Sequence, residues 1–120
     1  MTSALLTLPS SAAAWIEFVT ARPDAFLDQA RKHLATLKDG TSRSASETLE
    51  LWNEVTWALR SAGSPSYVLS ECHPDPAVRD AGSERYLAAS AFETELMLDC
   101  ALFDIFTAAQ SAPYAAALNA

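Results

Sequence analysis

Three adjacent residues, Glu71, Cys72 and His73, bring together the side-chain types that proteins use to bind zinc. Adjacent side chains rarely converge on one tetrahedral ion unless other ligands join them, and the only other histidine, His33, is forty residues away. Neither histidine belongs to a His-Glu-x-x-His motif, which would put two ligands on one helix face. We therefore predict no metal and no cofactor in this chain. We expect His73 to interact with the last carbonyl groups of a helix.

Cys100 and His73 could in principle act as a thiol nucleophile and its general base. The residues near them supply no third group and no oxyanion hole, and Cys100 lies in the most hydrophobic segment, where a thiolate is disfavoured. We interpret Cys72 and Cys100 as buried free thiols, which behave as small hydrophobic residues. The prediction is therefore that no residue of this chain is catalytic.

Two further groups of residues have structural interpretations. Asp99 and Asp104 could form a pair of carboxylates, but an offset of five residues separates them around a helix. We expect one to be solvated and the other to cap a helix or pair with an arginine. Trp15, Trp52 and Trp57 could form a ligand-stacking box, but aromatic residues at helical spacing usually belong to the core, where we place them.

Helix start and stop signals predict the elements that carry these residues. Pro23 suits the first position of a helix, so it should separate a short helix from a second one. Ser44 and Glu47 have the spacing of a capping box. Gly63 and Pro65 should end one helix and begin another. The predicted helices cover residues 10–20, 23–39, 45–61, 65–72, 76–110 and 112–120.

The predicted helix over 76–110 is the longest of these elements. Asp75 is a good N-cap, and no proline follows Pro76 inside this stretch. A length on the order of 50 Å exceeds the roughly 35 Å diameter of a compact domain of this size, so the helix should bend near Gly82 or overhang. The predicted fold class is all-α: one domain over 1–120, an irregular bundle of about five or six helices around one long helix.

The C-terminal part of this long helix is apolar on nearly every side. A helix that is hydrophobic on most faces is covered on most faces, and the short neighbouring helices cannot cover all of it. An exposed apolar patch on the order of several hundred Å² usually marks self-association or a partner site. We therefore expect a homodimer or larger assembly. The predicted interface residues are Leu96, Leu98, Leu102, Phe103, Ile105 and Phe106.

The charge balance and the first residues exclude other classes of partner. The sequence has 15 acidic and 8 basic residues, and the net charge of −7 repels a phosphate backbone. The uncharged stretch from Met1 to Ile16 contains polar residues, has no basic start and is too short to span a bilayer. We predict no nucleic-acid partner, no membrane insertion and a cytoplasmic location.

Three sequence motifs follow one another between Thr48 and Gln110. They are Leu51-Trp52-Asn53 in a helix, a His-Pro-Asp turn leading into Val-Arg-Asp-Ala from His73 to Ala81, and a long helix with Phe92-Glu93-Thr94-Glu95-Leu96 and Leu102-Phe103. This stretch resembles the N-terminal helical region of the thimet oligopeptidase family of zinc metallopeptidases. Residues Trp15 to Lys38 are a looser match.

The resemblance implies a zinc metallo-oligopeptidase as the parent enzyme. In that family the catalytic zinc is bound much further along a longer chain, by a His-Glu-x-x-His helix and a downstream glutamate. The helical N-terminal region forms part of one wall of a deep channel that admits only short, unfolded peptides. Zinc and peptides thus belong to the parent, and this chain departs from the family by lacking the motif.

The expected function is therefore that of a non-catalytic N-terminal helical domain, which contributes channel wall and substrate size exclusion. The chain would be a fragment, a split subunit or a free-standing relative, and its partner would be the remainder of the metallopeptidase or a second copy. The alternative is a free-standing helical module for protein–protein interaction or self-association without enzymatic activity. An abrupt ending after Pro113 favours a truncated chain.

Overall fold

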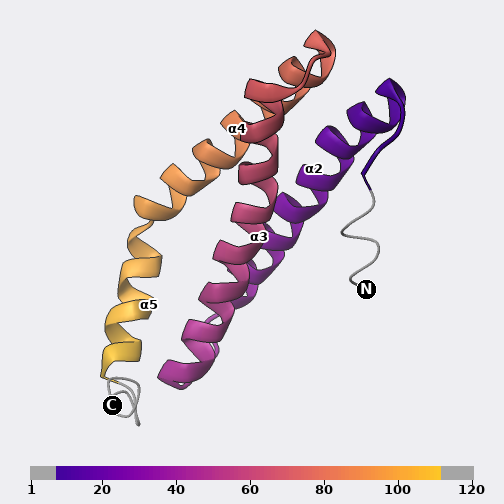
Figure 1. Ribbon diagram of the computed structural model, residues 1–120. Coiled ribbons are helices and arrows are strands. Elements are labelled where there is room, and N and C mark those ends of the chain that lie inside the picture. Colours follow the sequence, from indigo (N-terminus) through magenta and orange to yellow (C-terminus); the bar gives the residue numbers. More distant parts are fainter. Residues whose placement is uncertain (1–7, 112–120) are drawn as a thin grey trace.

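The chain folds into long helices. The computed structural model describes residues 8–111, and in this range the backbone forms four helices and no strand (Figure 1). The helices are α2 (Ala12–Leu37), α3 (Ala45–Cys72), α4 (Pro76–Met97) and α5 (Cys100–Gln110). The all-α prediction is confirmed, whereas the number of five or six helices is not matched by the four of the described part. The predicted helix over 112–120 lies outside the described residues.

Pro23 lies inside α2, so the predicted division into helices 10–20 and 23–39 is wrong. A proline in a helix interior loses a backbone hydrogen bond and costs about 3 kcal/mol. Packing offsets this cost, because Val19, Pro23 and Leu27 are all buried at four-residue intervals. One apolar face therefore continues through the proline without a change of phase.

α3 continues through Gly63 and Pro65 in the same way, which contradicts the predicted helices 45–61 and 65–72. Its buried face runs past both residues without interruption. Gly63 itself lies against α4, where an added Cβ would be 3.4 Å from the Cβ of Ala89. The buried residues around the two breakers are Ala58, Leu59, Ala62 and Ser66. Tertiary packing thus outweighs the local stop signals.

Two predicted helix starts are confirmed by their hydrogen bonds. The Ser44 hydroxyl accepts the backbone N–H of Glu47 at 3.1 Å, and the Glu47 carboxylate accepts that of Ser44 at 2.9 Å. Asp75 caps α4 by accepting the N–H of Ala77 at 2.9 Å, with Pro76 in the first turn. These side chains satisfy N–H groups that have no partner inside their helices.

The predicted long helix over 76–110 is two helices, because the backbone breaks at Leu98 and Asp99. The Asp99 carboxylate accepts the N–H groups of Ala101 and Leu102, at 2.9 and 3.3 Å, and so begins a new helix. An aspartate favours this capping position over a helix interior, since its short side chain competes for backbone N–H groups. The predicted bend therefore occurs at Asp99 instead of Gly82.

Helices α2, α3 and α4 form an antiparallel bundle (Figure 1). Each of the three packs on the other two, while α5 continues past the end of α4 and packs mainly on α3. The molecule is elongated, with extents of 52 × 31 × 24 Å. None of the described helices is long and apolar enough to cross a membrane. The main core cluster contains Leu27, Ala30, Leu37, Val55, Ala58, Leu59, Ala62, Ala89, Phe92, Leu96 and Leu102.

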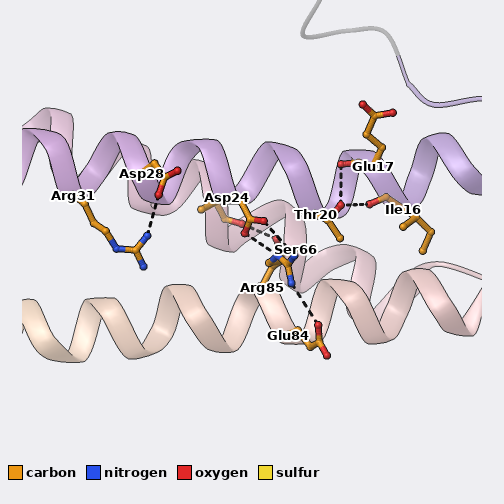
Figure 2. Close-up of polar contacts among 10 residues, drawn as sticks. Ile16, Glu17, Thr20, Asp24, Asp28, Arg31, Ser66, Glu84 and Arg85 are labelled. Carbon is orange, nitrogen blue, oxygen red and sulfur yellow. Dashed lines mark hydrogen bonds and ion pairs between the residues drawn. The ribbon is translucent and has the colours of Figure 1, made fainter.

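The three helices meet around Gly82 and Arg85 of α4. The Arg85 side chain reaches Asp24 of α2, with Nε 2.8 Å from Oδ1 and Nη2 3.2 Å from Oδ2, and its Nη1 lies 3.4 Å from Glu84 (Figure 2). Gly82 is buried, and an added Cβ would lie only 2.9 Å from the backbone oxygen of Ser66 in α3. The absent side chain allows α3 and α4 to approach.

Candidate functional site

The turn from His73 to Asp75 joins α3 to α4 and directly follows Glu71 and Cys72, the other two residues of the candidate zinc cluster. The backbone N–H of His73 donates to the carbonyl of Leu69 at 3.1 Å and so caps α3. Its ring Nδ1 accepts the backbone N–H of Asp75 at 3.1 Å. The contact of His73 with the last carbonyl groups of α3 is thus an ordinary backbone hydrogen bond, and the ring itself accepts an N–H from the turn instead.

Further contacts hold this turn rigidly in place. The guanidinium of Arg79 donates through Nη1 to the carbonyls of His73 and Pro74, at 2.8 and 2.9 Å. The ring of Trp15 in α2 meets the His73 ring edge-on, with 4.9 Å between centroids. One imidazole nitrogen therefore accepts a hydrogen bond and the ring is packed against α2. The turn thus has a structural role, because it connects α3 to α4 and contacts α2.

No metal site forms around the turn. Among residues 8–111, no group of three or more His, Cys, Asp or Glu side chains is placed to hold an ion. Cys100 and His73 flank opposite ends of α4, whose 22 residues extend about 33 Å, so they cannot form a thiol–imidazole pair. Both Cys72 and Cys100 are exposed, so their predicted burial is wrong.

Asp99 and Asp104 have different surroundings. Asp99 caps α5 and forms an ion pair with Lys38, the residue that follows α2. The hydrogen bond from Lys38 lowers the pKa of Asp99, and the backbone N–H groups of Leu102 and Ala101 add to this effect. Asp104 is exposed. The prediction of one capped and one solvated carboxylate is thus confirmed.

The connection that precedes α3 is organised by Asp39. Its carboxylate accepts the backbone N–H of Thr41 at 2.8 Å and two hydrogen bonds from Arg43 at 3.0 and 3.1 Å. The Thr41 N–H, followed by the Arg43 side chain, lowers the pKa of Asp39 to about 2. Gly40 takes a positive φ of 84°, which glycine adopts without steric cost. This fixed connection directly follows Lys38, the partner of Asp99.

The tryptophans do not form a ligand box. Trp15 and Trp52 are half-buried, in accord with a role in packing, and the Trp52 ring meets Phe106 of α5 edge-on at 5.1 Å. Trp57 is 56% exposed, so its predicted place in the core is wrong. Its ring instead meets Phe26 of α2 at the surface, with 5.5 Å between centroids.

The six predicted interface residues divide into two sets. Leu96 and Leu102 are buried, and Ile105 and Phe106 are half-buried against the core. Leu98 and Phe103 are 76% and 72% exposed. The first set therefore holds α5 on the bundle, and only the second set is available to a partner.

Sequence reasoning missed one exposed residue, Met97, which is 70% exposed beside Leu98. A signal for it exists in the helical spacing. Met97 lies one turn after Glu93, on the polar side of α4, whereas the buried Phe92 and Leu96 mark the opposite side. We call Met97, Leu98 and Phe103 the joint residues, because they lie on both sides of the break between α4 and α5.

Comparison with models of protein families, with curated proteins and with solved structures finds no match to this chain. None of these comparisons supports the expected relationship to the thimet oligopeptidase family, which rests on the motifs between Thr48 and Gln110 alone. In the structure these motifs lie along α3, the turn, α4 and α5.

Proposed function

We propose that this chain is a non-catalytic N-terminal helical domain of a zinc metallo-oligopeptidase, in which it contributes channel wall and substrate size exclusion. The observation that carries the proposal is the His73–Asp75 turn. The stretch from His73 to Ala81 is one of the motifs that resemble the family. Within it, His73, Asp75 and Arg79 make hydrogen bonds in the turn between α3 and α4. These bonds fix the α3–α4 hairpin as one unit, which a channel wall would need.

The shape of the molecule suits a wall. α2, α3 and α4 have 26, 28 and 22 residues, so each is about 33–42 Å long at the usual rise per residue. Antiparallel helices of this length satisfy their own backbone hydrogen bonds and present a stiff surface. Such a surface restricts a channel to peptides that are narrow enough to pass along it, and the reaction takes place on residues of another segment.

The joint residues supply a place for the rest of an enzyme to pack. Exposed apolar side chains at the end of the bundle would become buried against further helices of the same enzyme. The proposed partner is therefore the remainder of a metallopeptidase, whether it is part of the same polypeptide or a separate subunit. The proposal places the assembly in the cytoplasm.

A second candidate function follows from the same exposed side chains. A free-standing helical module for protein–protein interaction, or for self-association, would also expose an apolar surface of this kind. It differs from the first candidate in that the chain would neither be part of a peptidase polypeptide nor bind a peptidase subunit in its own cells.

Affinity capture from the source cells distinguishes the two candidates. Antibodies raised against residues 48–110 would be used to isolate the native polypeptide, and mass spectrometry would identify the sequences that it contains or binds. We expect a His-Glu-x-x-His sequence, either continuous with this chain or in a stoichiometric subunit. An antibody against an unrelated acidic helical protein serves as the control.

The proposal fails if the native polypeptide carries no metallopeptidase sequence and binds none. Capture of stoichiometric protein of another class would instead support the interaction module. Capture of this chain alone, at the mass of a multiple of the monomer, would support self-association.

A further inference from the structure

The most exposed large hydrophobic side chains of the described residues gather at one place. Met97, Leu98 and Phe103 are 70%, 76% and 72% exposed, more than any other large apolar residue between positions 8 and 111. They lie within seven positions of one another, across the break between α4 and α5. Side chains of this size normally lose more exposure on folding, so this surface fits a partner.

The charged residues nearest to these three in the sequence are all acidic. After Arg85 the sequence contains no lysine or arginine, whereas it contains Glu93, Glu95, Asp99 and Asp104. Glu93, Glu95 and Asp104 are exposed, and within the described part of the chain none of them takes part in an ion pair. The joint is therefore apolar and acidic.

Bases of the neighbouring helices match only part of this charge. Lys38 pairs with Asp99. Arg31 lies over the Phe92 ring, 5.5 Å from its centroid, and pairs with Asp28. Arg60 of α3 lines the same surface hollow as Glu93, so two carboxylates, Glu95 and Asp104, remain for an incoming partner to match.

We propose that the joint residues dock a basic amphipathic helix, one with apolar residues at intervals of three and four and with lysine or arginine beside them. The apolar face of such a helix would cover Met97, Leu98 and Phe103, and its bases would match Glu95 and Asp104. A helix is the suitable form, because the described residues offer no strand edge to which an extended peptide could add. Complementary charge also speeds the encounter and sets the orientation.

A second copy of the chain fits this surface less well. In a two-fold dimer each residue meets its own counterpart or that of a neighbour, so the acids of two joints would face each other. Like charges placed together oppose association by several kcal/mol. Residues 1–7 contain no lysine or arginine, so no side chain among them could pair with the acidic residues at the joint.

This inference does not rest on the proposed relationship to metallopeptidases. It follows from exposure and charge alone, and it holds whether the basic helix belongs to the rest of an enzyme or to an unrelated protein. Its test therefore uses the chain by itself.

Two synthetic probes test the docking directly. Both are fluorescein-labelled helical peptides with leucine at intervals of three and four, and the remaining positions are lysine in one and glutamate in the other. Fluorescence anisotropy at low salt measures their binding to the chain. We expect the lysine peptide to bind and the glutamate peptide to bind at least about tenfold more weakly.

Paired variants locate the binding site. The double variant Leu98→Ser/Phe103→Ser should weaken binding of the lysine peptide by about tenfold or more. Val68→Ser/Leu87→Ser is the matched control, since both residues are exposed apolar side chains elsewhere on α3 and α4, and it should change binding by less than about twofold. Circular dichroism confirms that both variants remain helical.

Charge reversal provides an independent measurement. Glu95→Lys/Asp104→Lys should reduce the preference for the lysine peptide over the glutamate peptide by about tenfold. Equal binding of the two peptides by the unaltered chain would overturn the proposal, as would equal losses in the joint and control variants. A dimer at low salt that Leu98→Ser/Phe103→Ser abolishes would also overturn it, because the occupant would then be a second copy.

Discussion

Two glycines in helices face neighbouring helices at different distances. An added Cβ at Gly82 would lie 2.9 Å from the backbone oxygen of Ser66, 3.1 Å from the backbone nitrogen of Ser70 and 3.3 Å from a methyl of Val19. At Gly63 the nearest atom would be the Cβ of Ala89 at 3.4 Å, an ordinary contact. Backbone atoms cannot move aside as a flexible side chain can, so the two sites respond differently to alanine.

Gly82→Ala should destabilise the fold by about 1–3 kcal/mol, because overpacking against α3 outweighs the better helix propensity of alanine. Gly63→Ala is the matched control and should stabilise by up to about 1 kcal/mol, since it gains propensity without a clash. Urea unfolding followed by circular dichroism measures both. A stabilised Gly82→Ala variant would show that α3 and α4 do not approach this closely.

Asp99 is the residue that ties the end of α2 to the start of α5. Its folded-state pKa is lowered, so its ionised form contributes stability that is fully present above the unfolded value of about 4 and is lost as the pH falls through the folded value. Lys38→Met removes the largest cause, so the pKa of Asp99 should rise towards its ordinary value. An NMR titration of the Asp99 carboxyl carbon checks this. An unchanged titration in the variant would contradict the ion pair.

The chemistry of single residues was partly predictable from the sequence. The capping role of one aspartate follows from a local pattern, because capping involves residues that are two or three positions apart. The exposure of Cys72, Cys100 and Trp57 depends on which neighbouring helix covers them, and a sequence does not contain that information locally. The Lys38–Asp99 pair spans 61 positions and was missed for the same reason.

At the scale of elements, the helical pattern was predictable and the boundaries were not. Pro23, Gly63 and Pro65 are strong local stop signals, yet α2 and α3 run through them. A correct prediction would have required comparing two quantities. One is the free-energy cost of each proline or glycine inside a helix, and the other is the gain from buried residues that keep the same helical spacing on both sides of it. Asp99 shows the converse, since a single capping aspartate divides an otherwise apolar helix.

α5 is held on the bundle by few side chains, and the Trp52–Phe106 ring pair is the clearest of them. A double-mutant cycle with Trp52→Leu and Phe106→Leu should give a coupling of about 0.5–1.5 kcal/mol, which is typical of edge-to-face rings. Trp57→Leu combined with Phe106→Leu is the control. Its effects should add within about 0.5 kcal/mol, because the Trp57 ring packs on Phe26. Additivity in both cycles would mean that α5 is not docked through Trp52.

The whole molecule combines an apolar joint with a net charge of −7. At low salt the acids around the joint oppose self-association, whereas at about 1 M salt the screening length falls to about 3 Å and this repulsion is largely removed. We therefore expect light scattering to give a monomer at low salt and a mass that rises with protein concentration at high salt. Leu98→Ser/Phe103→Ser should remain monomeric in both. If the mass of the unaltered protein depends on neither salt nor protein concentration, the joint residues do not mediate self-association.

The proposed function makes the chain part of a metallopeptidase to whose chemistry it contributes no residue. The most direct measurement compares the turnover of a quenched fluorescent peptide of about ten residues by two samples, the purified chain and the native material captured through residues 48–110. We expect no turnover by the purified chain, which lacks a His-Glu-x-x-His motif, and turnover by the captured material that a zinc chelator abolishes. Chelator-sensitive turnover by the purified chain, or none by the captured material, would contradict the account.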